Sequence, residues 1–201
     1  MAKRFFETFP ALILEDELKD LFEFAEVTAL KYNRDRTAIH VYLLCRRLIS
    51  KPQIYAVESK IEKQMFPDGD MKIRIFESFS LSEQYTPSYL VDVYKDSLFA
   101  EIKRRSDLDY HILMRADWKV ADDDSLLLTL EDSLWARNRA GELREWIQMV
   151  FYDRCAISIP VAVSFKERDT TAIEEEKKRA EAQAIARIMK ANSVASKRER
   201  G

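Results

Sequence analysis

Three consecutive elements between residues 125 and 166 constrain the fold more than any other stretch. The first is an apolar run at 126–130 that is too short for a helix of its own. Next comes a helix with one buried face, formed by apolar residues at the spacing i, i+3, i+4, i+7, i+8: Leu143, Trp146, Ile147, Val150 and Phe151. From Ile157 to Phe165 apolar residues then alternate with period two, as in a strand. A long crossover between two strands predicts a parallel pair with a right-handed connection.

The helix in this stretch is expected to be broken. It starts at about Leu134 and then meets Asn138-Arg139-Ala140-Gly141. The chain has 3 glycines, and a glycine in the middle of a helix costs about 1 kcal/mol relative to alanine, so this one indicates a backbone need. Asn138 and Gly141 both tolerate positive φ, which predicts a tight turn between a short helix and a long one.

Composition indicates a globular protein and excludes several classes. Of 201 residues, 47% are hydrophobic and 11% aromatic, which can fill the core of one medium domain or two small ones. Lys and Arg number 33 against 35 Asp and Glu, so the net charge of -2 gives no overall attraction to nucleic acid or anionic membranes. Cys45 and Cys155 lie far apart, which fits a reducing compartment and neither a disulfide scaffold nor a zinc site. With no apolar run of membrane-spanning length and no signal-peptide core, a cytoplasmic location is expected.

The first half of the chain reads as helix, strand, strand, helix, strand. An apolar arm around Pro10 is expected to dock, and a short helix follows at 16–24. Strands are predicted at 27–33 and 38–45, joined as a hairpin by a polar turn. A helix then runs from Pro52 to just before Pro67, and residues 71–76 alternate as a strand.

The second half repeats this order. Thr86-Pro87-Ser88 opens a helix that closes at Lys103-Arg104-Arg105, where cations suit the C-terminal dipole. Strands at 110–120 and 126–130 flank an acidic turn, and the broken helix and last strand complete the unit. The predicted fold class is therefore α+β, with two tandem αββαβ units at residues 1–80 and 81–168. Residues 169–201 are predicted to be a charged helical tail or linker.

Residue types that carry enzyme chemistry are scarce. Only His40 and His111 are present, both in predicted strands and neither within a metal-ligand spacing. The carboxylates of Asp122-Asp123-Asp124 would attract a hard cation, but a solvated loop is the simpler interpretation of this turn. A phosphate-binding glycine loop and the G-x-S-x-G and H-E-x-x-H motifs are absent. The sequence therefore predicts no catalytic site, metal, cofactor or small-molecule substrate.

The second unit resembles a type II KH domain in its order of elements. In KH domains a G-x-x-G turn between two helices approaches the nucleic-acid backbone, and here that place reads Asn-Arg-Ala-Gly. The predicted nucleic-acid-binding residues are Arg137, Asn138, Arg139, Ala140, Gly141 and Arg144. Glu142 and Glu145 weaken the positive field of the arginines, so a KH-like scaffold without nucleic acid stays an equal alternative.

Longer stretches resemble a known family. They are FPALILEDELKDLFE, KIRIFESFSLSEQYTPSYLVDVYKDSLFAEIK and LTLEDSLWARNRAGELREWIQMVFYDRC. With the strands between them, they make residues 1–168 similar to the N-terminal region of the PolC-type DNA polymerase III alpha subunit of low-GC Gram-positive bacteria, clostridial members above all. The resemblance implies a first domain similar to the polymerase-binding C-terminal domain of the clamp-loader tau subunit, and a second, KH-like domain. The family's later domains carry its metal-binding aspartates, so no catalytic residue is transferred to this chain.

Three functions fit the sequence. The first, which we carry forward, is a noncatalytic accessory region of a replicative DNA polymerase. It would contact replisome proteins, such as the clamp-loader tau subunit, through its first unit and bind DNA weakly through its second. The second function is a stand-alone KH-like protein that binds RNA or single-stranded DNA, and the third is a structural spacer. None of the three involves a membrane.

Overall fold

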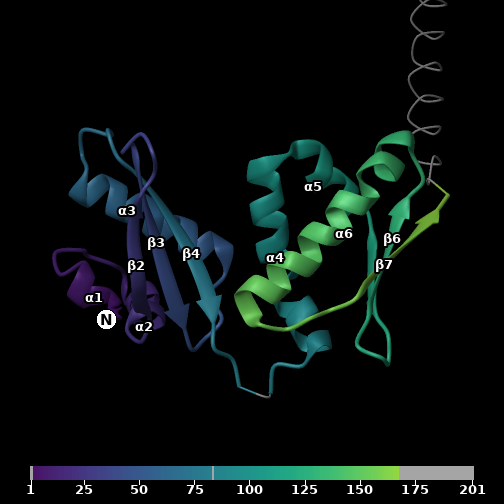
Figure 1. Ribbon diagram of the computed structural model, residues 1–201, viewed down its shortest axis with the longest axis horizontal. Helices are drawn as coiled ribbons and strands as arrows, with labels where there is room; N and C mark the ends of the chain where they lie inside the picture. The colour runs from purple at the N-terminus through teal and green to yellow at the C-terminus, as the bar shows by residue number, and fades with distance from the viewer. Residues whose placement is uncertain (1, 83, 168–201) are drawn as a thin grey trace, which may run out of the picture.

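The computed structural model describes residues 2–82 and 84–167, and the predicted tail at 169–201 lies outside them. The described residues build two β-sheets, one in each half of the sequence, with helices packed on them (Figure 1). The predicted α+β class is therefore confirmed, whereas the residue boundaries of the two domains stay predictions. No helix in the described part of the chain has the length and apolar character needed to cross a membrane.

The first unit follows the predicted order, with a short strand and a short helix added at its start. Its elements are β1 (Lys3–Arg4), α1 (Phe5–Thr8), α2 (Asp16–Phe22), β2 (Glu26–Tyr32), β3 (Ala38–Cys45), α3 (Lys51–Met65) and β4 (Lys72–Phe79). The sheet order is β1-β2-β3-β4, in which β2 and β3 pair antiparallel and β3 and β4 pair parallel. α3 begins close to the predicted place because the Ser50 side chain accepts a hydrogen bond from the Gln53 amide and Pro52 lies in the first turn.

The apolar arm docks on the first unit, as predicted. Phe5, Phe9 and Leu12 are buried, and the Phe5 ring centroid lies 4.9 Å from that of Phe22 in α2. The Phe5 amide also donates a hydrogen bond to the Ala25 carbonyl. Tilted aromatic pairs at this separation are favourable beyond the area that they bury. The arm is therefore part of the first unit's core.

The second unit repeats the strand arrangement of the first. Its elements are α4 (Pro87–Arg105), α5 (Asp107–Met114), β5 (Asp117–Val120), β6 (Leu126–Glu131), α6 (Leu134–Cys155) and β7 (Val161–Lys166). β5 and β6 pair antiparallel and β6 and β7 pair parallel, which confirms the parallel pair predicted from residues 125–166. Both sheets thus contain the same strand-strand-helix-strand order with the same strand directions.

The predicted strand at 110–120 is wrong over most of its length, because residues 107–114 form helix α5. The Ser106 side chain accepts a hydrogen bond from the Asp109 amide, and Asp107 and Asp109 lie in the first turn. Carboxylates in a first turn favour the helix dipole. This helix-start signal outweighs the apparent alternation that follows it. Only Asp117–Val120 forms a strand, and His111 lies on the helix.

The predicted break in the second unit's last helix is also wrong, because α6 runs unbroken from Leu134 to Cys155. Gly141 lies inside this helix, and among the described glycines only Gly69 has a positive φ. A continuous set of buried residues holds the helix on both sides of Gly141: Ala136, Leu143, Trp146, Ile147, Val150, Phe151 and Cys155. The turn between two helices on which the KH comparison depends is therefore absent, and the KH-like assignment is not confirmed.

The two units pack against each other. α4 contacts α3, and α6 contacts β4 (Figure 1). The Tyr94 ring of α4 lies 5.9 Å from Phe79 of β4 and 6.3 Å from Phe151 of α6. Buried apolar side chains from both halves form one cluster. The charged residues between the units therefore lie together at one junction.

Candidate functional site

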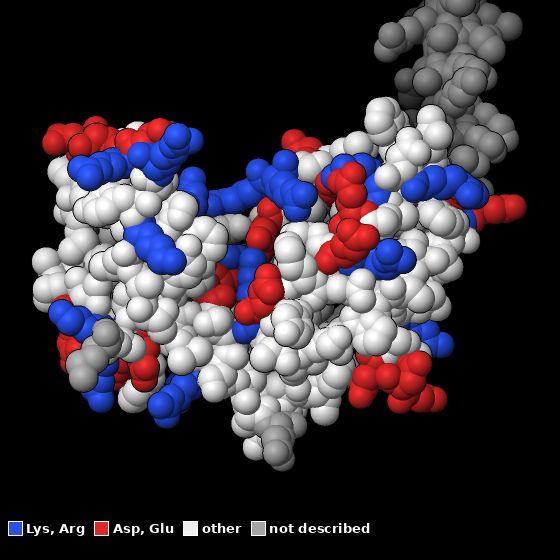
Figure 2. All heavy atoms as spheres, in the orientation of Figure 1, with Lys and Arg blue, Asp and Glu red and all other residues white. Residues whose placement is uncertain are grey.

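A polar cleft of about 640 Å³ lies between the two units. α3 and β4 line one side, and α4 and the end of α6 line the other. Figure 2 shows acidic and basic side chains gathered in the hollow between the two halves. The lining contains six basic residues, Lys51, Lys72, Arg74, Arg104, Arg105 and Arg154, and three acidic ones, Glu58, Glu62 and Glu101. A cleft with this local excess of positive charge favours an anionic ligand, although the whole chain has a net charge of -2.

A buried ionic network closes the inner end of the cleft. The Lys51 ammonium of α3 lies 2.8 Å from the Glu77 carboxylate of β4, and the Tyr94 hydroxyl of α4 donates to the same carboxylate at 3.0 Å. Arg154 of α6 donates to the Tyr94 oxygen at 3.1 Å and to Glu101 at 2.8 Å. The Glu77 side chain is fully buried, and a buried charge is tolerated only with partners of this kind. The network therefore links all four elements around the cleft.

Tyr94 and Arg154 each keep their proton in this network. Burial, reinforced by the Glu77 carboxylate, raises the pKa of Tyr94, so its hydroxyl stays protonated and remains a donor. Burial opposes the charge of Arg154, but Tyr94, Glu77 and Glu101 outweigh it and raise the pKa of the guanidinium above its usual value. A general acid or base needs a pKa near the working pH. Tyr94 and Arg154 therefore serve as structural donors, unsuited to proton transfer.

Two carboxylates of α3 cover the open edge of β4. Glu58 accepts a hydrogen bond from the Ile75 amide and Glu62 accepts one from the Ile73 amide, each at 2.8 Å. The Arg74 guanidinium donates to the Ile73 carbonyl at 2.9 Å. β4 is the last strand of its sheet, and an edge strand with free backbone groups invites pairing with another chain. These side chains therefore satisfy part of the backbone hydrogen-bonding groups along that edge.

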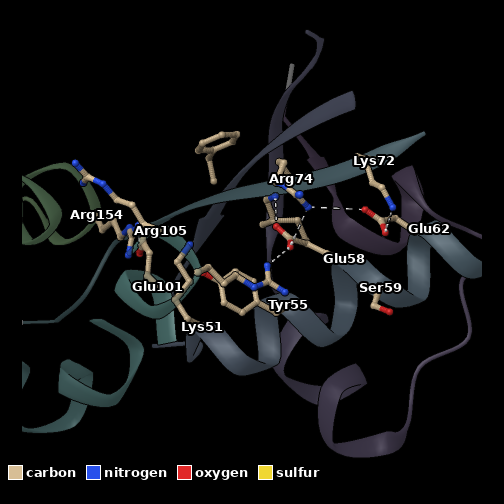
Figure 3. A pocket seen from close by; sticks show the side chains of 13 residues that line it. Lys51, Tyr55, Glu58, Ser59, Glu62, Lys72, Arg74, Glu101, Arg105 and Arg154 are labelled. Atoms are coloured by element: carbon tan, nitrogen blue, oxygen red, sulfur yellow. Dashed lines mark hydrogen bonds and ion pairs between the residues drawn. The ribbon is translucent and has the colours of Figure 1, made fainter. Parts of the chain in front are cut away.

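Half-exposed arginines lie beside these carboxylates (Figure 3). Arg74 lies 3.8 Å and Arg104 lies 3.4 Å from the Glu58 carboxylate, with side chains 50% and 53% exposed. The Arg104 guanidinium also stacks on the Tyr55 ring, 3.4 Å from its centroid. Burial raises the pKa of Glu58, while the Ile75 amide and the two arginines act to lower it. The exposed faces of both arginines can thus reach a ligand in the cleft.

The residues predicted to bind nucleic acid lie in the first half of α6 and do not line this cleft. Arg137 donates two hydrogen bonds to Asp132, both at 2.6 Å, and Arg139 donates two to Asp109, at 2.8 and 2.7 Å. The Arg144 guanidinium lies 3.6 Å from the carboxylate of its neighbour, Glu145. Asn138 and Gly141 are exposed, and Ala140 is partly buried. The three arginines thus face carboxylates, and their role in nucleic-acid binding stays a prediction.

The pair of Arg139 and Asp109 ties α6 to α5. Asp109 is fully buried, and its hydrogen bonds with Arg139 hold the pKa of this carboxyl below its usual range. Because a charge-assisted, two-point bond of this kind is strong, Arg139 is held on the second unit's own core. This structural use of the arginine was missed in the sequence, where Asp109 stood just before a predicted strand at 110–120.

The other residues singled out for chemistry do not come together. His40 lies on β3, where its ring meets Phe76 at 5.1 Å, and His111 lies on α5. Asp122-Asp123-Asp124 lies between β5 and β6, where Asp123 accepts hydrogen bonds from the amide and hydroxyl of Ser125. Across residues 2–82 and 84–167, no three or more His, Cys, Asp or Glu side chains are grouped so as to hold a metal ion.

The cleft itself was not predicted from the sequence. Lys103-Arg104-Arg105 was assigned only to the dipole of its helix, and Glu77 lay one residue beyond the predicted strand at 71–76. The signal was nevertheless present, because the inward alternation of Ile73 and Ile75 continues to Glu77 and Phe79. A carboxylate at an inward strand position implies a buried partner.

Comparison with known families identifies the first unit. The family model of the DNA polymerase III polC-type N-terminus I matches residues 4–75. No curated protein matches the chain. The match runs from β1 into β4, so it includes the α3 side of the cleft and no residue of the second unit. It agrees with the resemblance found in the first half of the sequence and leaves the second half unmatched. Residues 4–75 therefore match the N-terminus I domain of PolC-type DNA polymerase III.

Proposed function

We propose that the chain is a noncatalytic N-terminal accessory region of a PolC-type DNA polymerase III, which contacts other replication proteins in the cytoplasm. The match of residues 4–75 to N-terminus I of this polymerase carries the proposal. The second unit, residues 81–168, would follow as the next N-terminal domain of the same polymerase. This assignment is supported by the resemblance of residues 72–103 and 128–155 to the same polymerase family, because these stretches include most of α4 and all of α6.

The ionic network between the units supports a scaffold role. Glu77 contacts Lys51 within the first unit and Tyr94 and Arg154 across the junction. Charged groups that are fully engaged with one another suit a joint between two domains better than a reaction centre. We therefore expect the purified chain to incorporate no nucleotide into a primed template.

The first unit is the part proposed to contact replication proteins, with the clamp-loader tau subunit as the first partner to test. It exposes large apolar side chains, namely Ile13 at 76%, Phe24 at 53%, Leu30 at 48% and Tyr32 at 63%. Exposed aromatic side chains of this kind are common anchors of protein interfaces.

Direct binding to the purified tau subunit tests the proposal. Saturable binding is expected, and Phe24→Ala should weaken it by roughly tenfold, the equivalent of about 1.4 kcal/mol. Met149→Ala is the matched control, because Met149 in the second unit is 52% exposed against 53% for Phe24. If neither tau nor any other replication protein from a matching lysate binds the folded chain, the proposal is wrong.

The competing function is a stand-alone KH-like protein that binds RNA or single-stranded DNA. Its motif was the turn at Asn138-Arg139-Ala140-Gly141, and these residues lie inside one continuous helix. With that turn absent, no observation favours this alternative over a polymerase accessory region.

A further inference from the structure

The four-stranded sheet packs one face on α3, and no helix of residues 2–82 and 84–167 lies over its other face (Figure 1). In Figure 1, α3 passes behind β3 and β4, and no described helix lies across the side of these two strands that faces the viewer. Cross-strand register places Tyr42 beside Phe76, His40 beside Arg74, and Lys31 beside His40. We refer to these five side chains, together with Lys72 at the next outward position of β4, as the open face. The inward positions between them, such as Val41 and Ile75, are buried.

The open face carries an aromatic platform. The Tyr42 and Phe76 rings are stacked, with centroids 5.2 Å apart and planes inclined by 19°. The His40 ring meets Phe76 at 5.1 Å, and the Lys31 ammonium lies over the Tyr42 ring, 5.0 Å from its centroid. Phe76 is still 45% exposed. Part of the aromatic surface of the platform is therefore exposed to solvent and free of contacts within the described protein.

Positive charge surrounds the platform. Lys31, Lys72 and Arg74 occupy outward positions on β2 and β4, and Lys72 and Arg74 are 58% and 50% exposed. Among the outward positions of β2, β3 and β4, only Glu26, at the far end of the sheet, has a carboxylate, and that group faces Arg46. Exposed aromatic rings among cations are the combination that binds an unpaired polynucleotide, through stacked bases and neutralised phosphates.

The platform is continuous with the cation-lined cleft. Lys72, Arg74 and Phe76 of β4 belong to the open face and also line the cleft. Beyond them lie Arg104 and Arg105 at the end of α4. The carboxylates at this border, Glu58 and Glu62, accept hydrogen bonds from backbone amides of β4, which offset part of their charge. A nucleic-acid strand that crosses β4 would thus pass from the aromatic rings, on which bases can stack, to the basic side chains, which can hold phosphates.

We propose that single-stranded DNA binds across β4, with bases stacked on Tyr42 and Phe76 and phosphates held by Lys72, Arg74 and the arginines of the cleft. The choice of DNA over RNA rests on the proposed function, whereas the choice of a single strand rests on the platform, because bases in a duplex do not offer their faces to a protein ring. The aromatic platform of this site lies on the first unit and the arginines of the cleft lie on the second, and none of these residues is among those of α6 predicted earlier.

Fluorescence anisotropy with a labelled thymidine oligomer of about 12 nucleotides tests the site, because one small domain covers roughly 4 to 16 nucleotides. Phe76→Ala and Tyr42→Ala should each weaken binding by roughly tenfold, the loss expected for one stacked base. Phe76→Tyr should retain affinity. Arg74→Gln should reduce the slope of log K against log salt concentration by about 0.7, the value for one phosphate contact to a single strand. Circular dichroism melts establish that each variant is folded.

Arg144→Gln serves as the matched control, because it removes an exposed arginine of α6. Its affinity should equal that of the wild type, and a loss as large as that of Phe76→Ala would place the binding on α6 and overturn the proposal. Equal binding of a duplex, much tighter binding of a uridine oligomer, or more effective competition by an acidic peptide than by unlabelled oligomer would also overturn it. So would the absence of binding up to about 100 µM protein at low salt, the weak limit of nonspecific affinity. Tau binding is measured separately, so failure here leaves the replisome contact intact.

Discussion

Replacing Gly141 by alanine should stabilise the protein, and this substitution separates the observed helix from the predicted turn. Gly141 lies inside α6, has no positive φ, and has no atom within 4 Å of the position that a Cβ would occupy. Glycine in a helix interior is less favourable than alanine by about 0.8–1.0 kcal/mol. Because the new methyl group meets open space, nothing offsets that gain. We expect the free energy of unfolding to rise by about 0.5–1 kcal/mol.

Gly69→Ala is a matched control for Gly141→Ala. Gly69 also has no atom within 4 Å of an added Cβ, but its φ is +74°. An L-residue in the left-handed region costs about 1–2 kcal/mol, so Gly69→Ala should lower stability by roughly that amount. The two variants add the same methyl group to open space and differ only in backbone conformation.

Urea denaturation followed by circular dichroism measures both changes, and a gain of 1 kcal/mol should also raise Tm by about 2–4 °C for a chain of this size. If Gly141→Ala instead lost 1 kcal/mol or more, as Gly69→Ala should, the continuous helix would be wrong. A left-handed turn at this position, as in a KH domain, would then be restored.

Two further predictions concern buried charges. Glu77→Ala leaves the buried Lys51 ammonium without its carboxylate partner and removes one of two carboxylates beside Arg154, so it should lower the free energy of unfolding by about 3–5 kcal/mol in urea denaturation. Glu15→Gln, which removes only an exposed pair with Lys60, should leave it nearly unchanged. Asp109→Asn should cost roughly 2 kcal/mol at pH 7. Because Arg139 lowers the pKa of Asp109 in the folded state, this pair stabilises the protein above the unfolded carboxyl pKa of about 3.9 and loses that effect as the pH falls through the folded pKa. The stability difference between wild type and Asp109→Asn should therefore shrink between pH 5 and the acid limit of folding, and a difference that stayed constant with pH would contradict the assignment.

Periodicity located most of the first unit, because its strands and helices have one buried face each. The alternation in β3 and the stripe of Ile54, Val57 and Ile61 in α3 are clear in the sequence. Pro52 marked the first turn of α3 in the sequence, and the structure adds the cap at Ser50. The short strand β1 could not be predicted in this way, because two exposed residues carry no pattern and pair with β2 only through tertiary contacts.

The second unit was predicted less well because a single residue type was given too much weight. Glycine is rare in this chain, and the presence of one at position 141 therefore suggested a special backbone geometry. The buried series Ala136, Leu143 and Ile147 continues past it at helical spacing and decides the outcome, because burial of an apolar stripe outweighs the small propensity cost of one glycine. The Ser106 cap was visible in the sequence, but the buried bond between Asp109 and Arg139 was not, since it joins residues far apart in the chain.

Net charge proved a poor guide to the cleft for a physical reason. The acidic residues on its border are occupied by the protein itself, since Glu58 and Glu62 accept backbone amides of β4. The basic residues beside them, Arg74 and Arg104, keep half of their surface in solvent. Electrostatic attraction acts over about 8 Å at physiological salt, so an approaching ligand senses this local arrangement and not the whole-chain value of -2. A nearly neutral chain can therefore hold a distinctly cationic groove, provided that its carboxylates are used to close a sheet edge.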